Sequence, residues 1–424
     1  MSRSNPCQIC AFFKQIWPFK PAITPKKSTI TDESELNPFS EKLSTTNIPE
    51  NLTMTTTPTP DSLKLITTVE RLRYFLKQAM KIEHATIPPY MTALYSIHPG
   101  TNLEAFHIIR AVAVEEMLHL CLAANVYNAV GGTFDEPVLT APDFIPIYPS
   151  YLPTGSTDFK VGLGKFSQET IETFRQIERS EEVKEGQPVV QSRALEQFLF
   201  DFIGWDPTKS FFSIGLFYAE IIRGLNALDR EYKQKGQNLF SGDPARQIGP
   251  EYYYNGGGDI IKVTDLRSAI RALKIIQEQG EGSRVNTIYD AERELAHDYR
   301  FQQILLGQYY KIDKEDPTKS DQPNHPTGQT FEVKWDAVYP IKENASLEDY
   351  PKDSEVYQEA VKFQQGYSHF LAKIEHSFNG HPEDLIPAVG GMFRLKEQAN
   401  ALMRNPIPGK PGFNAAPVFR ADQT

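Results

Sequence analysis

Two segments with the pattern Glu-x-x-His constrain this 424-residue sequence more than any other feature: Glu116-x-x-His119 and Glu294-x-x-His297. Residues i and i+3 share one face of a helix, so each segment can present a carboxylate and an imidazole to one metal ion. Glu116 and His119 fall within an apolar stripe that continues through Leu120, whereas a surface ion pair would have polar neighbours. The surroundings of Glu294 and His297 are more polar. The pattern predicts metal ligation by both pairs, with a hydrogen-bonded buried Glu–His pair as the alternative.

A third match, Glu104-x-x-His107, is interpreted as the start of a helix, with Thr101 and Glu104 as a capping-box pair. Glu104 precedes Glu116 by 12 residues, which turns it about 120° around the helix and places it about 18 Å along the axis. The third pair is therefore excluded from a site that contains Glu116.

A helical bundle that binds two metal ions takes one further Glu from each of two more helices. Glu83 occupies a core-facing position of its predicted helix, with a salt bridge to Lys81 or a nearby Arg as the alternative. Glu220 lies in an apolar helical segment, with an i, i+3 ion pair to Arg223 as the alternative. Four carboxylates would balance two divalent cations, and one imidazole per metal favours iron, with manganese as the second choice. The predicted ligands are Glu83, Glu116, His119, Glu220, Glu294 and His297.

The rest of the chain predicts a mainly α fold with long connections. Helical periodicity is present at 62–97, 101–131, 167–181, 191–203, 209–233, 264–279, 284–310, 353–378 and 383–403. Pro88-Pro89 predict a kink or a division of the first helix. Irregular loops are predicted at 133–165 and 234–260, and a strand-like patch at 331–338. The predicted domains are a disordered leader at 1–61, a dimetal bundle at 62–310 and a C-terminal helical extension at 311–424 that packs on the bundle.

Composition excludes several classes of function. The formal net charge is −10 and no basic block is present, which argues against binding to nucleic acid or an anionic membrane. No apolar run approaches the length of a membrane span, and three cysteines cannot form a disulfide framework. The first 20 residues lack the continuous apolar region of a secretory signal. We therefore expect a cytoplasmic protein that does not span a membrane. The sequence leaves its oligomeric state open, and a homo-oligomer is one alternative.

Two stretches of the sequence are distinctive: Glu83–Ile97, which reads EHATIPPYMTALYSI, and Glu115–Leu120, which reads EEMLHL. They resemble the ferritin-like family, and in particular the ferritin-like domains of iminophenylpyruvate dimer synthases from violacein-type pathways. Weaker similarity extends the resemblance over about residues 63–420. The resemblance implies a four-helix bundle with Glu83, Glu116, His119, Glu294 and His297 as metal ligands.

One position departs from the family. Relatives carry a Glu where this sequence has Leu216, and Glu220 lies four residues further along. Three alternatives follow: Glu220 replaces the missing ligand, one metal has an open coordination position, or only one metal binds tightly.

The leading functional hypothesis is an O2-dependent oxidase or oxygenase with two iron ions bridged by Glu116 and Glu294. Relatives in amino-acid-derived pathways imply a small, amino-acid-derived metabolite as substrate, and Tyr252, Tyr253 and Tyr254 either line its pocket or pack as ordinary loop residues. The alternatives are an iron-binding, ferroxidase-type protein and a catalytically silent scaffold.

Overall fold

The computed structural model describes residues 65–152, 159–179, 214–281, 289, 294–313 and 316–421. The expected leader at 1–61 and the expected helix at 191–203 lie outside them. Within the described ranges the fold is mainly α, and isolated β-bridges occur without any β-strand. The helices are α2 (Val69–Ser96), α3 (Leu103–Ala129), α4 (Gln168–Glu178), α6 (Ile214–Gln234), α7 (Leu266–Glu281), α8 (His297–Leu306), α9 (Glu355–Phe378) and α10 (Leu385–Met403). Short 3-10 turns occur at Pro244–Arg246, Pro317–Lys319, Leu347–Asp349 and Pro382–Asp384.

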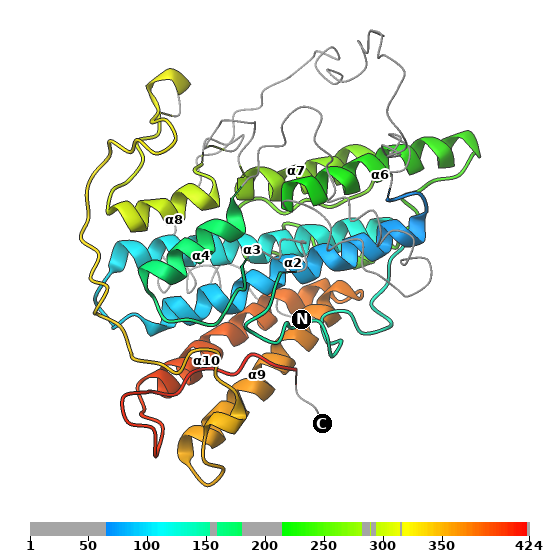
Figure 1. The fold of residues 1–424 in the computed structure, drawn as a ribbon. Helices are drawn as coiled ribbons and strands as arrows, with labels where there is room; N and C mark the ends of the chain where they lie inside the picture. Colours follow the sequence, from blue (N-terminus) through cyan, green and yellow to red (C-terminus); the bar gives the residue numbers. More distant parts are fainter. Residues whose placement is uncertain are drawn as a thin grey trace, which may run out of the picture. The chain divides into compact units, whose positions relative to one another are not determined.

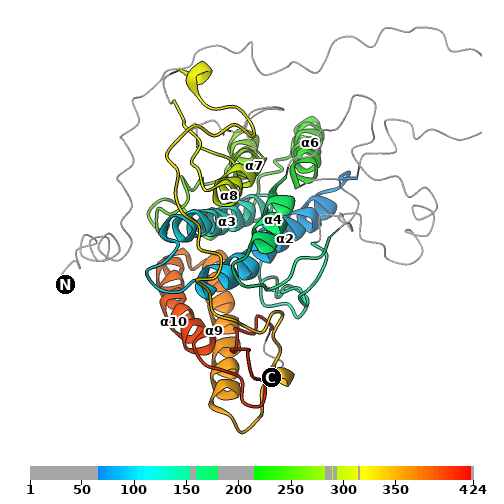
Figure 2. The ribbon, with the colours of Figure 1, turned by 60° about the vertical axis from the view of Figure 1, so that its left-hand side comes forward.

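Helices α2 and α3 lie side by side and form the central layer (Figures 1 and 2). Helices α4, α6, α7 and α8 cover one face of this pair, with α4 against α8 and α6 against α7. Helices α9 and α10 pack together on the opposite face, where α9 contacts α3 and α10 contacts α2. Every residue of α3 from position 112 to 129 is buried, as expected for a helix that is apolar almost all round.

The C-terminal helices enclose an apolar cavity against the central pair. Its lining includes Met117 and Leu120 of α3, Tyr367 of α9 and Leu395 of α10. These α3 residues follow Glu116 and His119 directly in the chain, so the cavity borders the segment of α3 that carries those two side chains.

Helix α2 continues through its two prolines to Ser96 instead of dividing there. Pro89 has no N–H to donate to the carbonyl of Ala85, which would leave that buried oxygen unpaired. The hydroxyl of Tyr148, from the irregular loop, donates to this oxygen at 2.7 Å. In the next turn of the helix, the Thr92 hydroxyl donates to the carbonyl of Pro88 at 2.7 Å. The loop at 133–152 therefore holds α2 at the point where the helix is weakest.

The predicted capping box at the start of α3 is wrong. The N-cap is Asn102, with φ 48° and ψ 42°, and its side chain makes no cap hydrogen bond. The Thr101 hydroxyl donates to the carbonyl of His98 instead. The Asn102 side chain binds the backbone N–H and C=O of Lys334, within the segment that was predicted to be strand-like. That segment forms only an isolated bridge between Val338 and Ile97. A tertiary contact has thus displaced the local cap.

No helix in the part of the chain that the structure describes is long and apolar enough to cross a bilayer.

Candidate metal centre

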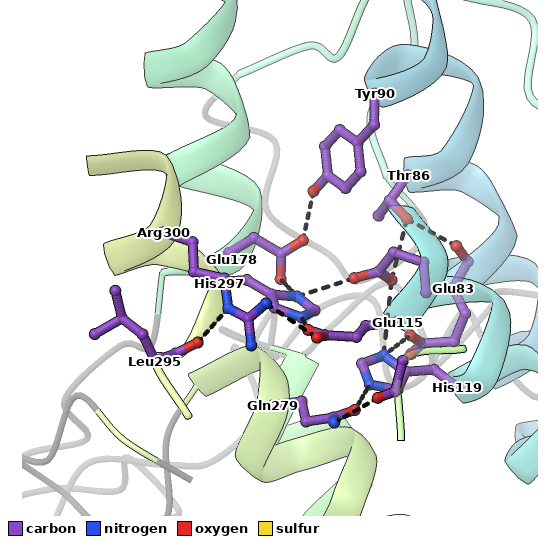
Figure 3. A network of polar contacts seen from close by, with 12 residues as sticks. Glu83, Thr86, Tyr90, Glu115, His119, Glu178, Gln279, Leu295, His297 and Arg300 are labelled. Atoms are coloured by element: carbon purple, nitrogen blue, oxygen red, sulfur yellow. Dashed lines mark hydrogen bonds and ion pairs between the residues drawn. The ribbon is translucent and has the colours of Figure 1, made fainter. Parts of the chain in front are cut away.

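Two groups of buried side chains that could hold a metal ion meet between α2, α3, α4 and α8 (Figure 3). Half-site A consists of Glu83, Glu116 and His119, and half-site B consists of Glu116, Glu178 and His297. Within each half-site the ligand atoms lie within 4.8 Å of one another. Glu116 belongs to both, so the two half-sites form one continuous centre.

In half-site A, Nδ1 of His119 lies 3.1 Å from Oε2 of Glu83 and 3.8 Å from Oε2 of Glu116. The second oxygen of Glu83 accepts a hydrogen bond from the hydroxyl of Tyr218, on α6, at 2.5 Å. Tyr218 is fully buried, and its bond fixes the rotation of the Glu83 carboxylate. One oxygen of Glu83 is therefore held by the protein while the other faces the centre.

Half-site B repeats this arrangement with residues from different helices. Nδ1 of His297 lies 3.0 Å from Oε1 of Glu116 and 3.4 Å from Oε2 of Glu178. The hydroxyl of Tyr90 donates a short hydrogen bond to the other oxygen of Glu178. The imidazole rings of the two histidines are nearly parallel, with centroids 5.6 Å apart. The centre is thus close to two-fold symmetric about the Glu116 carboxylate.

Nδ1 of His119 faces Glu83 and Glu116, and the hydrogen bond of the outer nitrogen, Nε2, determines whether Nδ1 can ligate a metal. Nε2 lies 2.8 Å from Oε1 of Gln279. The amide nitrogen of Gln279 donates to the carbonyl of Gly257 at 3.0 Å, so the amide oxygen must face His119. Because that oxygen can only accept, Nε2 of His119 carries the proton and Nδ1 offers its lone pair to a cation.

The outer nitrogen of His297 faces a carboxylate instead. Nε2 lies 2.8 Å from Oε2 of Glu115, and the other oxygen of Glu115 lies 3.0 Å from Nη1 of Arg300. Although burial opposes ionisation, Arg300 and His297 lower the pKa of Glu115. The ionised carboxylate accepts the Nε2 proton, so Nδ1 of His297 is also available as a metal ligand.

Three ionised carboxylates offset most of the charge of two divalent cations, with one carboxylate fewer than the sequence predicted. With no cation bound, burial raises the pKa of Glu83 to about 7 and, together with Glu116, raises the pKa of Glu178. Burial opposes a charge on His119, but Glu116 and Glu83 raise its pKa to about 10. Protons on the imidazoles therefore offset the carboxylate charge where cations would otherwise do so. Three carboxylates and two imidazoles are nitrogen and oxygen ligands of the kind that iron(II) and manganese(II) accept. The residues present fit two such ions.

Comparison with known proteins gives the family. A family model described as Ferritin-like matches residues 76–306, more than half of the chain. The chain belongs to the ferritin-like family. The match begins within α2 and ends at the last residue of α8, so it includes every member of both half-sites.

Two further comparisons found similar proteins. The ferritin-like chain is 25% identical over 338 residues to a dichlorochromopyrrolate synthase from Lentzea aerocolonigenes. This alignment covers 74% of the chain and 29% of the synthase, so the chain spans less than a third of that relative. A crystal structure of a ferritin-like protein from Caulobacter vibrioides superposes with a TM-score of 0.53 at 20% identity. That match covers 84% of this chain and 99% of the other, and it shows a shared fold.

Four of the six predicted ligands meet in the ferritin-like centre, namely Glu83, Glu116, His119 and His297. The structure does not bring Glu220 to them. Oε1 of Glu220 accepts the backbone N–H groups of Leu65 and Ile66 at 3.0 and 2.8 Å, and Oε2 lies 2.6 Å from Nε of Arg223. The ion pair with Arg223 is the alternative that the sequence left open. Glu220 therefore holds the segment that leads into α2.

We expect Glu220→Ala to destabilise the fold while leaving metal binding intact. The variant leaves two backbone N–H groups without their acceptor, at a cost of about 1–3 kcal/mol for each group. Chemical denaturation of the metal-free protein would measure the loss, and elemental analysis would measure bound metal. Loss of metal without loss of stability would instead place Glu220 among the ligands.

Glu294 also lies outside the centre. Helix α8 begins at His297, and Glu294 precedes it in an exposed, non-helical position. The prediction that both residues share one helix face required a helix across 284–310, and the described residues have helix only from His297. Without that helix, the i, i+3 relation does not bring the two side chains together.

Glu178 joins the centre although the sequence analysis did not select it. It is the last residue of α4, a helix of 11 residues with a Ser167 N-cap. Ile171, Phe174 and Glu178 follow the spacing i, i+3, i+7, and the two apolar residues are fully buried, so the signal was present. Arg175 of α4 binds Asp298 of α8 at 2.7 Å. This contact fixes the helix ends that carry Glu178 and His297.

Proposed function

We propose that this ferritin-like protein is a di-iron enzyme that uses O2 to oxidise a small, amino-acid-derived metabolite. The observation that carries the proposal is the sharing of Glu116 between two half-sites, each with its own carboxylate and its own imidazole Nδ1. A surface ion pair, or a buried Glu–His pair that only stabilises the core, would not require two matching sets of ligands around one carboxylate. Placing five such groups in a buried position is costly unless cations are bound there.

The residues of the chain have separate tasks in this proposal. Glu116 would bridge the two ions, Glu83 and His119 would hold one, and Glu178 and His297 would hold the other. Tyr218 and Tyr90 keep the terminal carboxylates in place through their outer oxygens. Two iron ions in this position would supply the electrons that reduce O2. Because all five ligating side chains are buried, the protein also keeps bulk water from the centre.

The relative from Lentzea aerocolonigenes supports an enzymatic function, because its name describes the synthesis of a small molecule. The substrate class is part of the proposal, since the identity is low and the chain spans a fraction of that enzyme. The contribution of Glu178 also weakens the argument for a silent scaffold. That argument depended on a missing carboxylate at Leu216, and α4 supplies a carboxylate in its place.

Metal loading followed by exposure to O2 tests the proposal. The full chain, purified without chelator and loaded anaerobically with Fe(II), is expected to bind about two irons per chain. Addition of O2 should then oxidise the bound iron, with O2 uptake measured by an oxygen electrode and the iron oxidation state by Mössbauer spectroscopy. Many irons per chain in a large assembly would favour iron storage. Absence of bound metal under all conditions would leave the scaffold interpretation.

A further inference from the structure

The two half-sites match in most of their contacts, and their main difference is the outer partner of each histidine. In each, a terminal carboxylate receives a tyrosine hydroxyl and a histidine presents Nδ1 to Glu116. In half-site A the proton on Nε2 of the histidine faces the neutral amide of Gln279. In half-site B it faces the carboxylate of Glu115. Figure 3 shows Gln279 next to His119 and Glu115 next to His297.

This difference changes what each histidine offers to a cation. A charged acceptor forms a stronger hydrogen bond to Nε2–H than a neutral one, and it increases the electron density at Nδ1. Arg300 binds the far oxygen of Glu115 and leaves the near oxygen for His297. Nε of Arg300 is itself anchored by the carbonyl of Leu295 at 2.5 Å. The Glu115 carboxylate is therefore held in the orientation that His297 requires.

The bridging carboxylate adds a second asymmetry in the same direction. The hydroxyl of Thr86 has one proton and two acceptors in reach: the carbonyl of Glu83 at 2.8 Å, and Oε2 of Glu116, the oxygen that faces His119, at 3.2 Å. The oxygen that faces His297 is Oε1. The share of this proton that Oε2 receives withdraws electron density from half-site A, which adds a smaller preference for a cation in half-site B.

From these contacts we infer that half-site B binds a divalent metal ion first and more tightly, and that Glu115 is the positioning residue responsible. The inference rests on the proposed dimetal centre. It does not depend on the reaction, because it concerns the order in which the two positions fill.

Titration with Mn(II) tests the order of filling without O2 chemistry. Metal-free full-length protein is titrated, and free Mn(II) is counted by its EPR signal. The wild type should show two binding steps whose dissociation constants differ by about 10- to 100-fold, the range typical of an outer-sphere partner. Glu115→Gln retains the size and an acceptor oxygen but removes the charge. It should weaken the tighter step by a similar factor and bring the two steps together.

Gln279→Leu is the matched control, because it removes the outer acceptor of the other histidine. It should weaken only the second step. Circular dichroism checks that each variant folds. Glu115→Asp is a second test variant, because its shorter side chain keeps the charge but moves it away from Nε2 of His297. It should also weaken the tighter step.

The outcomes separate this inference from the proposed function. Two wild-type sites of equal affinity, or an unchanged tighter step in both Glu115 variants, would overturn the inference and leave the dimetal centre standing. Two unequal sites with the expected response to Glu115→Gln, in a protein that does not react with O2, would support the inference and count against the oxidase. No binding of Mn(II), and none of Fe(II) added anaerobically, would overturn both.

Discussion

A Glu116→Gln variant is expected to lose both metal ions. Its two carboxylate oxygens face different histidines, with Oε1 3.0 Å from Nδ1 of His297 and Oε2 3.8 Å from Nδ1 of His119. A neutral amide in this position removes one anionic ligand from each half-site and can no longer bridge two cations. Elemental analysis after Fe(II) or Mn(II) loading should therefore fall from about two ions per chain to near zero. A His119→Ala variant, which alters half-site A alone, should retain the ion of half-site B.

The same helix provides a control for this experiment. Glu104 begins the third Glu-x-x-His segment, in the first turn of α3 and outside the centre. Glu104→Gln makes the same chemical change in the same sequence pattern and should leave two ions bound. Retention of both ions by Glu116→Gln would show that Glu116 is not shared. Retention of one ion would assign it to a single half-site.

The mainly α fold and three of the centre's five residues follow from local sequence periodicity. Glu83, Glu116 and His119 occupy core-facing positions of long helices, where 3.6-residue periodicity determines the buried face. The ferritin-like fold that the resemblance implied is confirmed by the family model and by the crystal structure of a ferritin-like protein. What periodicity could not supply was the choice between several carboxylates on neighbouring helices.

Glu220 and Glu178 illustrate this limit. Both lie on the buried face of a helix, and both are buried carboxylates in the structure. The carboxylate of Glu220 forms an ion pair with Arg223. It also accepts hydrogen bonds from two backbone N–H groups that lie more than 150 residues away in the chain. Glu178 instead faces Glu116 and His297. The partner of a buried charge depends on which segments pack beside it, and a pattern within one helix contains no information about that packing.

Glu294 lies outside the centre for a different reason, because its assignment as a ligand depended on where helix α8 begins. The i, i+3 argument holds only where the helix is continuous, and α8 begins at His297. The N-cap of α8 is Ala296, whose side chain cannot cap. Helix starts are predicted from capping side chains, so a start without one gives no local signal.

The two carboxylates Glu178 and Glu294 can be separated by one pair of variants. Glu178→Gln removes the terminal carboxylate of half-site B and should leave about one metal ion per chain, whereas Glu294→Gln should leave about two. With Mn(II), a coupled two-ion EPR spectrum should become that of an isolated ion in Glu178→Gln only.

Glu172→Gln provides the matched control for this pair, because Glu172 lies on the same short helix as Glu178 but binds the partly exposed Arg175. It should retain both ions. The reverse result, with metal lost from Glu294→Gln and kept by Glu178→Gln, would mean that metal binding extends α8 toward Glu294. The i, i+3 pair predicted from the sequence would then be the ligand pair of the loaded protein. Because half-site B already presents a carboxylate, a bridging oxygen and an imidazole nitrogen within 4.8 Å of one another without that extension, we expect the loss to follow Glu178.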